Sequence, residues 1–249
     1  MPVRKTSTAW FLKPNALHKE TDMPVSLYLY GSPISTYYNK VKIALIELGH
    51  PFEEIPVMPG AGHWPESGSP SGKIPYLRHG DQYVYESQAI IEYLEDIREP
   101  MAPSLFPGEV LQRAQCRELI QYIEQYLDTP MRPIYQSVFW GKEMPAGLLD
   151  KTLEDLKKGL TIVLRRTSLD PWLCSGRFTH ADIAAWVHLS TIQWALAIAG
   201  HKTFFQQHAP QLGPYLQQLA ERPSIERSEA DRKETSRRIK AERAAAKGG

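Results

Sequence analysis

The chain has 249 residues, of which 42% are hydrophobic and 23% are charged, and its 29 basic and 28 acidic side chains give a formal net charge of +1. These proportions argue against a disordered or fibrous chain, and the balanced charge argues against nucleic acid or an anionic membrane as a partner. Only two cysteines occur, without a CxxC motif, which argues against a disulfide framework and a structural zinc site. We therefore expect a cytoplasmic globular protein that binds small molecules or proteins and no metal.

The N-terminal segment lacks the features of a targeting or membrane segment. Residues 1–24 contain one short apolar stretch, AWFL, which is too short for a signal peptide. The whole chain has no run of about 18 apolar residues that would cross a membrane. We expect residues 1–24 to form a flexible extension. An organelle presequence is the alternative, because Arg4, Lys5 and Lys13 stand among serines and threonines.

The residues from 25 onward alternate between strand and helix patterns. Branched and aromatic residues in VSLYLY, residues 25–30, predict a buried strand that ends at Gly31. Apolar residues from Val41 to Leu48 recur at helical spacing and predict a helix. The segment PFEEIPV then predicts a second short strand, so this stretch has the order of a parallel β-α-β unit.

A hairpin and a second helix follow. Residues 59–72 are rich in glycine, proline and serine and predict a surface loop. IPYLRH and QYVYES flank a glycine-containing turn and predict two antiparallel strands. Apolar residues at helical spacing then predict a helix that begins at Ser87. The first domain, residues 25–98, is therefore expected to hold a mixed four-stranded sheet with helices on its faces.

The second half of the chain is predicted to be helical. Three prolines within residues 99–107 indicate a linker between two domains. The helical pattern of residues 109–140 contains Pro130 and Pro133, which should kink or break the helix. Another helix is expected over residues 148–166.

A buried central helix and a charged tail complete the predicted architecture. Thr179 and Asp182 form a capping-box pattern before an almost entirely apolar segment, ADIAAWVHLSTIQWALAIAG. A helix that is apolar all round is buried, so this segment predicts the centre of an all-helical domain at residues 108–226. Residues 227–249 alternate in charge and lack an apolar stripe, and we expect them to form a solvated, frayed tail.

Four features of the first domain point to one binding site. The polar stretch SPISTYYN follows the first strand and precedes a helix, a position that binds anions and other ligands in α/β proteins. A cis peptide bond between Ile74 and Pro75 would present the Ile74 backbone to an extended peptide. Glu86 and Ser87 suit a ligand that carries an amine and a carboxylate, and Lys73 suits a second carboxylate.

The order of these motifs carries a family resemblance. GSPISTYYNKVKIAL, SPSGKIPYL, ESQAIIEYL and GRFTHADIAAW resemble the cytosolic glutathione transferase superfamily, and look most like its serine-type bacterial and phi-like members. The resemblance covers about residues 25–226. It implies an α/β thioredoxin-like N-terminal domain followed by an all-α C-terminal helical bundle, with glutathione as cosubstrate and no metal.

The resemblance implies that Ser35 donates a hydrogen bond to the glutathione sulfur. Tyr30 is the alternative donor, because tyrosine-type transferases place the sulfur-binding hydroxyl at the end of the first strand. This chain has serine where cysteine-type relatives have a nucleophilic cysteine. A mixed disulfide between the enzyme and glutathione is therefore disfavoured.

The same resemblance implies roles for the other motif residues. Ile74, beside the family's cis proline at Pro75, would pair with the cysteinyl backbone of glutathione. Glu86 and Ser87 would hold the γ-glutamyl end. Lys73 would lie near the glycyl carboxylate.

The electrophile pocket is expected to use aromatic residues, namely Tyr37, Tyr126, Tyr135 and Phe139. The leading hypothesis is a glutathione transferase that activates the glutathione thiolate for attack on small hydrophobic electrophiles. The alternatives are a glutathione-dependent peroxidase, disulfide reductase or isomerase on the same fold, and a non-catalytic glutathione-binding interaction protein. The resemblance also implies a homodimer.

Overall fold

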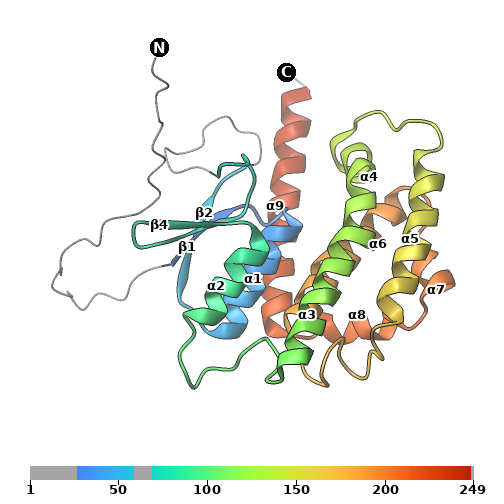
Figure 1. Cartoon of the computed structure of the whole chain (residues 1–249). Helices are drawn as coiled ribbons and strands as arrows, with labels where there is room; N and C mark the ends of the chain where they lie inside the picture. The colour runs from blue at the N-terminus through green and yellow to red at the C-terminus, as the bar shows by residue number, and fades with distance from the viewer. Residues whose placement is uncertain (1–26, 59–68, 248–249) are drawn as a thin grey trace, which may run out of the picture.

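The computed structural model describes residues 27–58 and 69–247, which form a sheet domain and a helical domain lying side by side (Figure 1). The predicted N-terminal extension, residues 1–24, and most of the predicted loop at residues 59–72 lie outside the described residues. In the part of the chain that the structure describes, the first domain consists of β1 (Leu27–Gly31), α1 (Thr36–Leu48), β2 (Phe52–Pro56), β3 (Tyr76–His79), β4 (Gln82–Tyr85) and α2 (Ser87–Asp96).

The sheet has the mixed topology that the sequence predicts. Its strand order is β2-β1-β3-β4, with β1 parallel to β2 and antiparallel to β3. Because successive side chains of a strand point to opposite faces, Leu27 and Leu29 of β1 are buried while Tyr28 and Tyr30 lie on the other face. The expected thioredoxin-like arrangement is confirmed.

The turn from β1 into α1 requires a glycine. Gly31 has a φ of 153°, and a Cβ at this position would overlap the Tyr38 ring. The Tyr38 ring is buried, and its hydroxyl donates a hydrogen bond of 2.5 Å to Glu54 in β2. This close approach fixes the start of α1 against the carboxyl end of β1.

The second domain is helical throughout its regular structure. It contains α3 (Val110–Ile123), the π-helical segment η1 (Glu124–Asp128), α4 (Thr129–Trp140), α5 (Leu148–Leu164), α6 (His180–Ile198), α7 (Phe204–His208), α8 (Leu212–Ala220) and α9 (Pro223–Lys247). The predicted helical stretch of residues 109–140 is helical without a gap from Val110 to Trp140, and Pro133 lies inside α4. The regular α-helix is interrupted only by the π-helical segment η1, just before Pro130, which lacks the backbone N–H that a regular helix uses.

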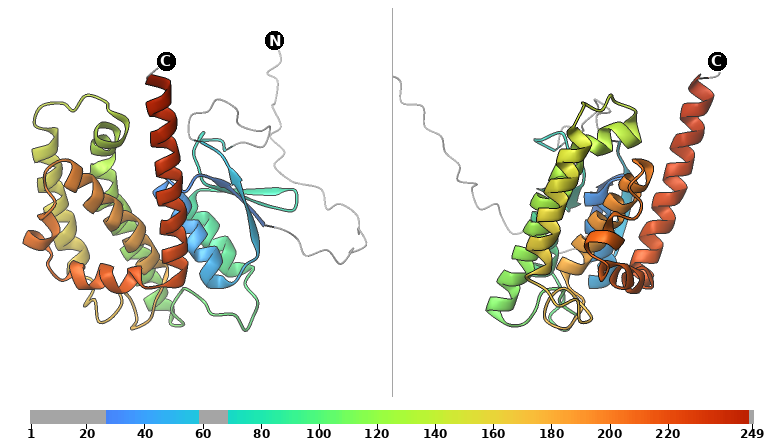
Figure 2. Two further views of the ribbon diagram at one scale, coloured as in Figure 1. Left: turned by 180° about the vertical axis from the view of Figure 1, so that it is seen from behind. Right: turned by 90° about the vertical axis from the view of Figure 1, so that its right-hand side faces the viewer.

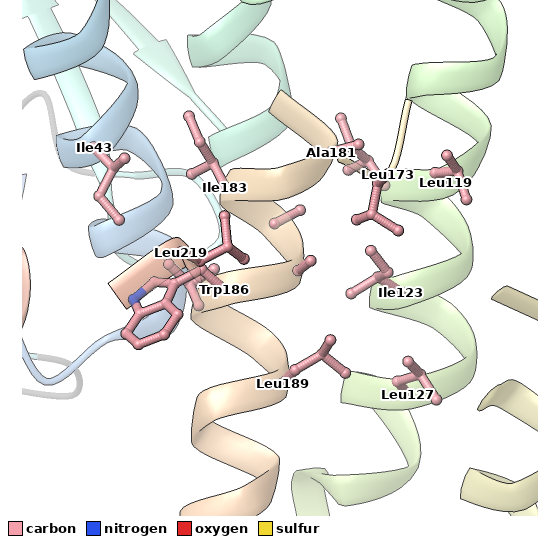
Figure 3. Packing of buried hydrophobic residues seen from close by; sticks show 14 of the residues in the cluster. Ile43, Leu119, Ile123, Leu127, Leu173, Ala181, Ile183, Trp186, Leu189 and Leu219 are labelled. Atoms are coloured by element: carbon pink, nitrogen blue, oxygen red, sulfur yellow. The ribbon is translucent and has the colours of Figure 1, made fainter. Parts of the chain in front are cut away.

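Helix α6 is the buried centre of the second domain, as the sequence predicts. The Thr179 Oγ1 accepts a hydrogen bond of 3.3 Å from the Ala181 amide, and the Asp182 carboxylate accepts one of 2.8 Å from the Thr179 amide. Figure 3 shows α6 between α1 of the first domain and the α3–η1 segment of the second, with Ile183 on the side of Ile43 in α1 and Leu189 on the side of Leu127 in η1. The apolar core therefore continues across the domain junction.

The expectation of a solvated, frayed tail over residues 227–249 is wrong for the part that the structure describes. This part belongs to α9, a long helix that runs alongside α1 at the domain junction (Figures 1 and 2). Asp231 forms an ion pair of 2.5 Å with the buried Lys42 of α1, and the Arg232 guanidinium lies 5.2 Å from the ring centre of Trp194. The helix docks through charged heads and their aliphatic stems rather than through an apolar stripe, so the hydrophobic pattern does not reveal it.

Candidate active site

A cavity of about 410 Å³ opens beside the start of α1, at the carboxyl end of β1. It brings together most of the residues that the sequence singles out. The lining residues are Ser35, Tyr37, Ser69, Ser71, Gly72, Lys73, Ile74, Pro75, Glu86, Ser87, Glu124 and Arg132.

Ser35 is the N-cap of α1. Its backbone is extended, with φ −85° and ψ 123°, and its Oγ accepts a hydrogen bond of 3.3 Å from the Tyr38 amide. The cap therefore uses the hydroxyl oxygen as an acceptor, and none of the described residues accepts a hydrogen bond from the hydroxyl proton. The Ser35 O–H group can therefore donate a hydrogen bond to a ligand atom in the cavity, at the positive end of the α1 dipole.

Tyr30, the alternative sulfur donor, lies outside this cavity. Its ring stacks on that of Tyr76 with a centroid distance of 4.6 Å, and its hydroxyl oxygen accepts a hydrogen bond of 3.2 Å from the Arg78 Nε. These contacts place Tyr30 on the sheet face that carries Tyr76 and Tyr83, away from the start of α1.

The Ile74–Pro75 peptide bond is cis, and both residues line the cavity just before β3. Glu86, which also lines the cavity, precedes α2 with a φ of 65°. A positive φ costs a residue with a side chain about 1–3 kcal/mol, and such strain concentrates at functional sites. Ser87 follows as the first residue of α2 and is buried. The N-terminus of a second helix, with its free backbone amides, therefore also lies at the cavity.

The structure contains a second, smaller cavity of about 220 Å³. Ile34 lines it, whereas the next residue, Ser35, lines the larger one. The smaller cavity is lined by Ile34, Val138, Phe139, Trp140, Thr191, Trp194, Ile198, Arg232, Ser236, Ile239 and Lys240. The second domain, including α9, thus provides nearly all of the wall of the smaller cavity.

The structure separates the four aromatic residues expected in the electrophile pocket. Phe139 lines the smaller cavity and Tyr37 the larger one. Tyr126 and Tyr135 line neither cavity: the Tyr126 side chain is exposed, and Tyr135 is buried with its hydroxyl donating to Asp128 at 3.3 Å. Helical spacing alone does not distinguish these orientations, because η1 changes the register between Tyr126 and Tyr135.

Comparison with known proteins identifies the family. A sequence profile described as "Glutathione S-transferase, N-terminal domain" matches residues 29–102. A glutathione S-transferase of Pseudomonas putida is 32% identical over 209 residues, which cover 83% of this chain and 92% of the relative. The chain belongs to the glutathione S-transferase family.

Two further relatives agree with this assignment. Glutathione S-transferase 4 of Zea mays is 27% identical to this transferase over 79% of the chain and 88% of the relative. A solved structure of a glutathione S-transferase from Methylobacterium radiotolerans, in complex with glutathione sulfonate, is 26% identical and superposes with a TM-score of 0.65 over 82% of this chain and 94% of that one. The transferase is thus an enzyme of the glutathione-binding superfamily that its motifs resemble.

No group of three or more His, Cys, Asp or Glu side chains within the described ranges is arranged to hold a metal ion. Of the helices that the structure describes, none is long and apolar enough to cross a membrane.

Sequence reasoning missed the contribution of the second domain to the larger cavity. Glu124 and Arg132 line it, and both belong to a cluster of charged side chains that also contains the buried residues Lys40 and Asp128. The Glu124 carboxylate lies 2.6 Å from the Lys40 Nζ, and the Arg132 Nε donates to Asp128 at 2.9 Å. Asp128 also accepts a hydrogen bond of 3.0 Å from the Tyr37 hydroxyl.

His188 of α6 completes this cluster between the two carboxylates. Its Nδ1 lies 3.1 Å from an Asp128 oxygen, and its Nε2 lies 3.6 Å from a Glu124 oxygen. Burial alone would raise the pKa of the Glu124 carboxyl, but the neighbouring His188 and the Lys40 ammonium outweigh burial and lower that pKa to about 2. The Glu124 carboxylate, which lines the cavity, is therefore ionised at neutral pH.

Proposed function

We propose that the transferase binds glutathione in the larger cavity, stabilises its thiolate with Ser35, and directs the thiolate at a small hydrophobic electrophile in the smaller cavity. The observation that carries this proposal is the position of two adjacent residues. Ile34 lines the smaller cavity and Ser35 the larger one. A sulfur bonded to the Ser35 hydroxyl would therefore lie at the boundary between cosubstrate and electrophile.

The required stabilisation of the thiolate is modest. A free thiol with a pKa of about 8.5 is only a few per cent ionised at pH 7, and lowering its pKa by about two units makes most of it thiolate. This shift corresponds to about 2.7 kcal/mol of preferential binding of the anion. The Ser35 hydroxyl donor and the dipole of α1 together are of this magnitude.

The remaining groups of the larger cavity suit the rest of glutathione. We assign Ile74 to the cysteinyl backbone, Glu86 and Ser87 to the γ-glutamyl amine and carboxylate, and Lys73 to the glycyl carboxylate. Their support is that all four line the cavity together with Ser35, and that the charges of Glu86 and Lys73 complement the amine and the glycyl carboxylate of the tripeptide.

Replacement of Ser35 tests the proposal directly. Loss of one hydrogen bond to a charged sulfur should lower kcat by about 10- to 100-fold in Ser35→Ala, while the KM for glutathione changes by less than about threefold. Tyr30→Phe is the matched control, because it removes the hydroxyl of the alternative donor and should leave kcat within about twofold. Because Ser35 also caps α1, thermal denaturation should accompany the kinetics. A large loss in Tyr30→Phe with near-normal Ser35→Ala would assign the sulfur to Tyr30 instead.

We also propose that the transferase is a cytoplasmic homodimer that acts without membrane or nucleic-acid partners. The support is family membership and the balanced net charge of +1. Size-exclusion chromatography with light scattering measures the oligomeric state, and a monomeric mass would contradict this assignment.

A further inference from the structure

The smaller cavity has one apolar wall and one basic wall. Phe139 and Trp194 form the apolar side, with their ring centroids 4.5 Å apart. The polar side comes mainly from α9, where Arg232, Ser236 and Lys240 follow one another at intervals of four residues and so lie on one face of the helix. No acidic side chain is among the described residues that line this cavity.

Lys240 is the basic residue of this wall that lacks a counter-ion. The Arg232 guanidinium donates two hydrogen bonds to Glu229, of 3.0 and 2.6 Å, so its charge is largely compensated. Lys240 is exposed and forms no ion pair or hydrogen bond with any residue in the described part of the chain. Its ammonium group is therefore available to a ligand in the cavity.

The basic character continues beyond the cavity. A groove of about 340 Å³ shares four lining residues with the cavity, namely Trp194, Arg232, Ser236 and Lys240, and adds Lys233 and Arg237. Again, none of its described lining residues is acidic. Arg237 lies 3.9 Å from Glu234, so Lys233 and Lys240 are the basic residues of the groove for which the described residues provide no counter-ion. Their charges favour anionic ligands at this surface.

We infer that the preferred electrophiles are small aromatic molecules that carry a carboxylate or another anionic group, with Lys240 as the residue that binds this group. The inference rests on the proposed function and adds the substrate class to it. The aromatic ring would lie against Phe139 and Trp194, with its reactive carbon toward Ile34 and its anionic group toward α9. The volume of about 220 Å³ is below the about 300 Å³ at which drug-sized pockets begin, which suits a single substituted ring.

The position of Lys240 at the exposed edge of the cavity makes this arrangement energetically feasible. An anionic group buried among aromatic side chains would lose its hydration at a large cost. At the edge, the anion keeps part of its hydration and gains a modest attraction from the ammonium group. Such a pair selects among electrophiles without holding the conjugate so tightly that its release becomes slow.

A chloronitrobenzoate and its uncharged primary amide form a suitable pair of test electrophiles. In both, the thiolate sulfur bonds to the ring carbon that carries chlorine, the carbon–chlorine bond breaks, and chloride leaves with the bonding electron pair. The carboxylate or amide group is unchanged in the reaction. The ratio of kcat/KM for the carboxylate to that for the amide therefore measures recognition of the charge, after correction for the uncatalysed rates of the two compounds.

The wild-type transferase should prefer the carboxylate, and the ratio should fall roughly fivefold in Lys240→Gln, the limit expected for a solvent-exposed ion pair. Lys240→Arg should retain the preference, and Lys240→Glu should reverse it. Arg238→Gln is the matched control: it removes the same charge from the same helix at a position that lines neither the cavity nor the groove. It should leave the ratio unchanged.

The possible outcomes separate this inference from the proposed function. Two results would overturn the inference and leave the proposed function intact. One is turnover of the amide without any preference for the carboxylate. The other is an equal decrease of the carboxylate-to-amide ratio of kcat/KM in Arg238→Gln and Lys240→Gln. Binding of glutathione without turnover of either compound would overturn both.

Discussion

At the scale of single residues, the charges of the cluster at the larger cavity depend on one another. Lys40 is completely buried, and its Nζ contacts Glu124 at 2.6 Å and Gln88 at 3.2 Å. Asp128 is 1% exposed and is surrounded by donors from Tyr37, Arg132 and Tyr135. Removal of one member of such a cluster leaves another charge buried without a partner, which typically costs several kcal/mol.

The lowered pKa of Glu124 makes stability depend on pH. The pKa of this carboxyl falls from an ordinary 4.5 to about 2 in the folded protein, so its contribution is complete above pH 4.5 and is lost as the pH falls toward 2. We expect this group to account for about 2–3 kcal/mol of the decrease in the free energy of unfolding over that range. Glu124→Gln should be destabilised at pH 7 and should show a shallower decrease in acid.

Urea denaturation at a series of pH values measures this dependence. Glu118→Gln is a suitable control, because Glu118 pairs with Arg166 at the surface and its loss should change stability by less than about 1 kcal/mol. If the free energy of unfolding decreased equally steeply at acidic pH in Glu124→Gln and the wild type, the assignment of this pH dependence to Glu124 would be contradicted.

The residues of the larger cavity differ in how far the sequence predicts them. Ser35, Ile74 and Ser87 stand in local patterns, a helix cap, an X-Pro bond and a helix start, and the structure brings them to one cavity. Glu124 and Arg132 are ordinary charged residues in a helical segment. Their place in the cavity follows from how the second domain packs against the first, which no local pattern contains.

At the scale of elements, α5 passes unusually close to η1. Gly159 is buried in α5, and a Cβ there would overlap the Tyr126 carbonyl oxygen and lie 2.7 Å from the Leu127 Cδ2. This glycine therefore sets the distance between α5 and the π-helical segment that carries Glu124 and Asp128.

Two glycine replacements test this packing. Gly159→Ala should destabilise the protein by about 2–3 kcal/mol through overpacking, although alanine is the better helix former. Gly213→Ala, in α8, is the matched control because nothing lies within 4 Å of its added Cβ, and it should be neutral or stabilising by up to about 1 kcal/mol. Equal stabilities of the two variants in thermal denaturation would contradict the close packing at η1.

The sequence predicts the elements unequally, for physical reasons. Side-chain caps and apolar spacings specify α1 and α6 locally, and apolar spacing specifies α2, whose N-cap Glu86 makes no side-chain capping hydrogen bond. The pattern does not reveal that α9 packs as a helix, because Asp231 and Arg232 are held by Lys42, Glu229 and the Trp194 ring. An alternating charge pattern therefore indicates a solvated tail only when no partner surface carries matching charges.

At the scale of the whole molecule, the candidate active site exists only where the two domains meet. The first domain provides Ser35, and the second provides Arg132 and the aromatic wall of the smaller cavity. Helix α6 packs against α1 on one side and α3 on the other, so the same apolar core that joins the domains also aligns the two cavities. The family resemblance predicts this architecture, but the register of the second domain, and hence the set of side chains that line the smaller cavity, required the structure.

The most direct test of the central claim is an ultraviolet titration of the glutathione thiolate in the binary complex, compared between the wild type and Ser35→Ala. We predict that the bound thiol in the wild type has a pKa about two units below the value of about 8.5 for a free thiol, and that Ser35→Ala returns it most of the way to that value. A bound thiol with the ordinary pKa in the wild type, or a lowered pKa that persists in Ser35→Ala, would contradict the account.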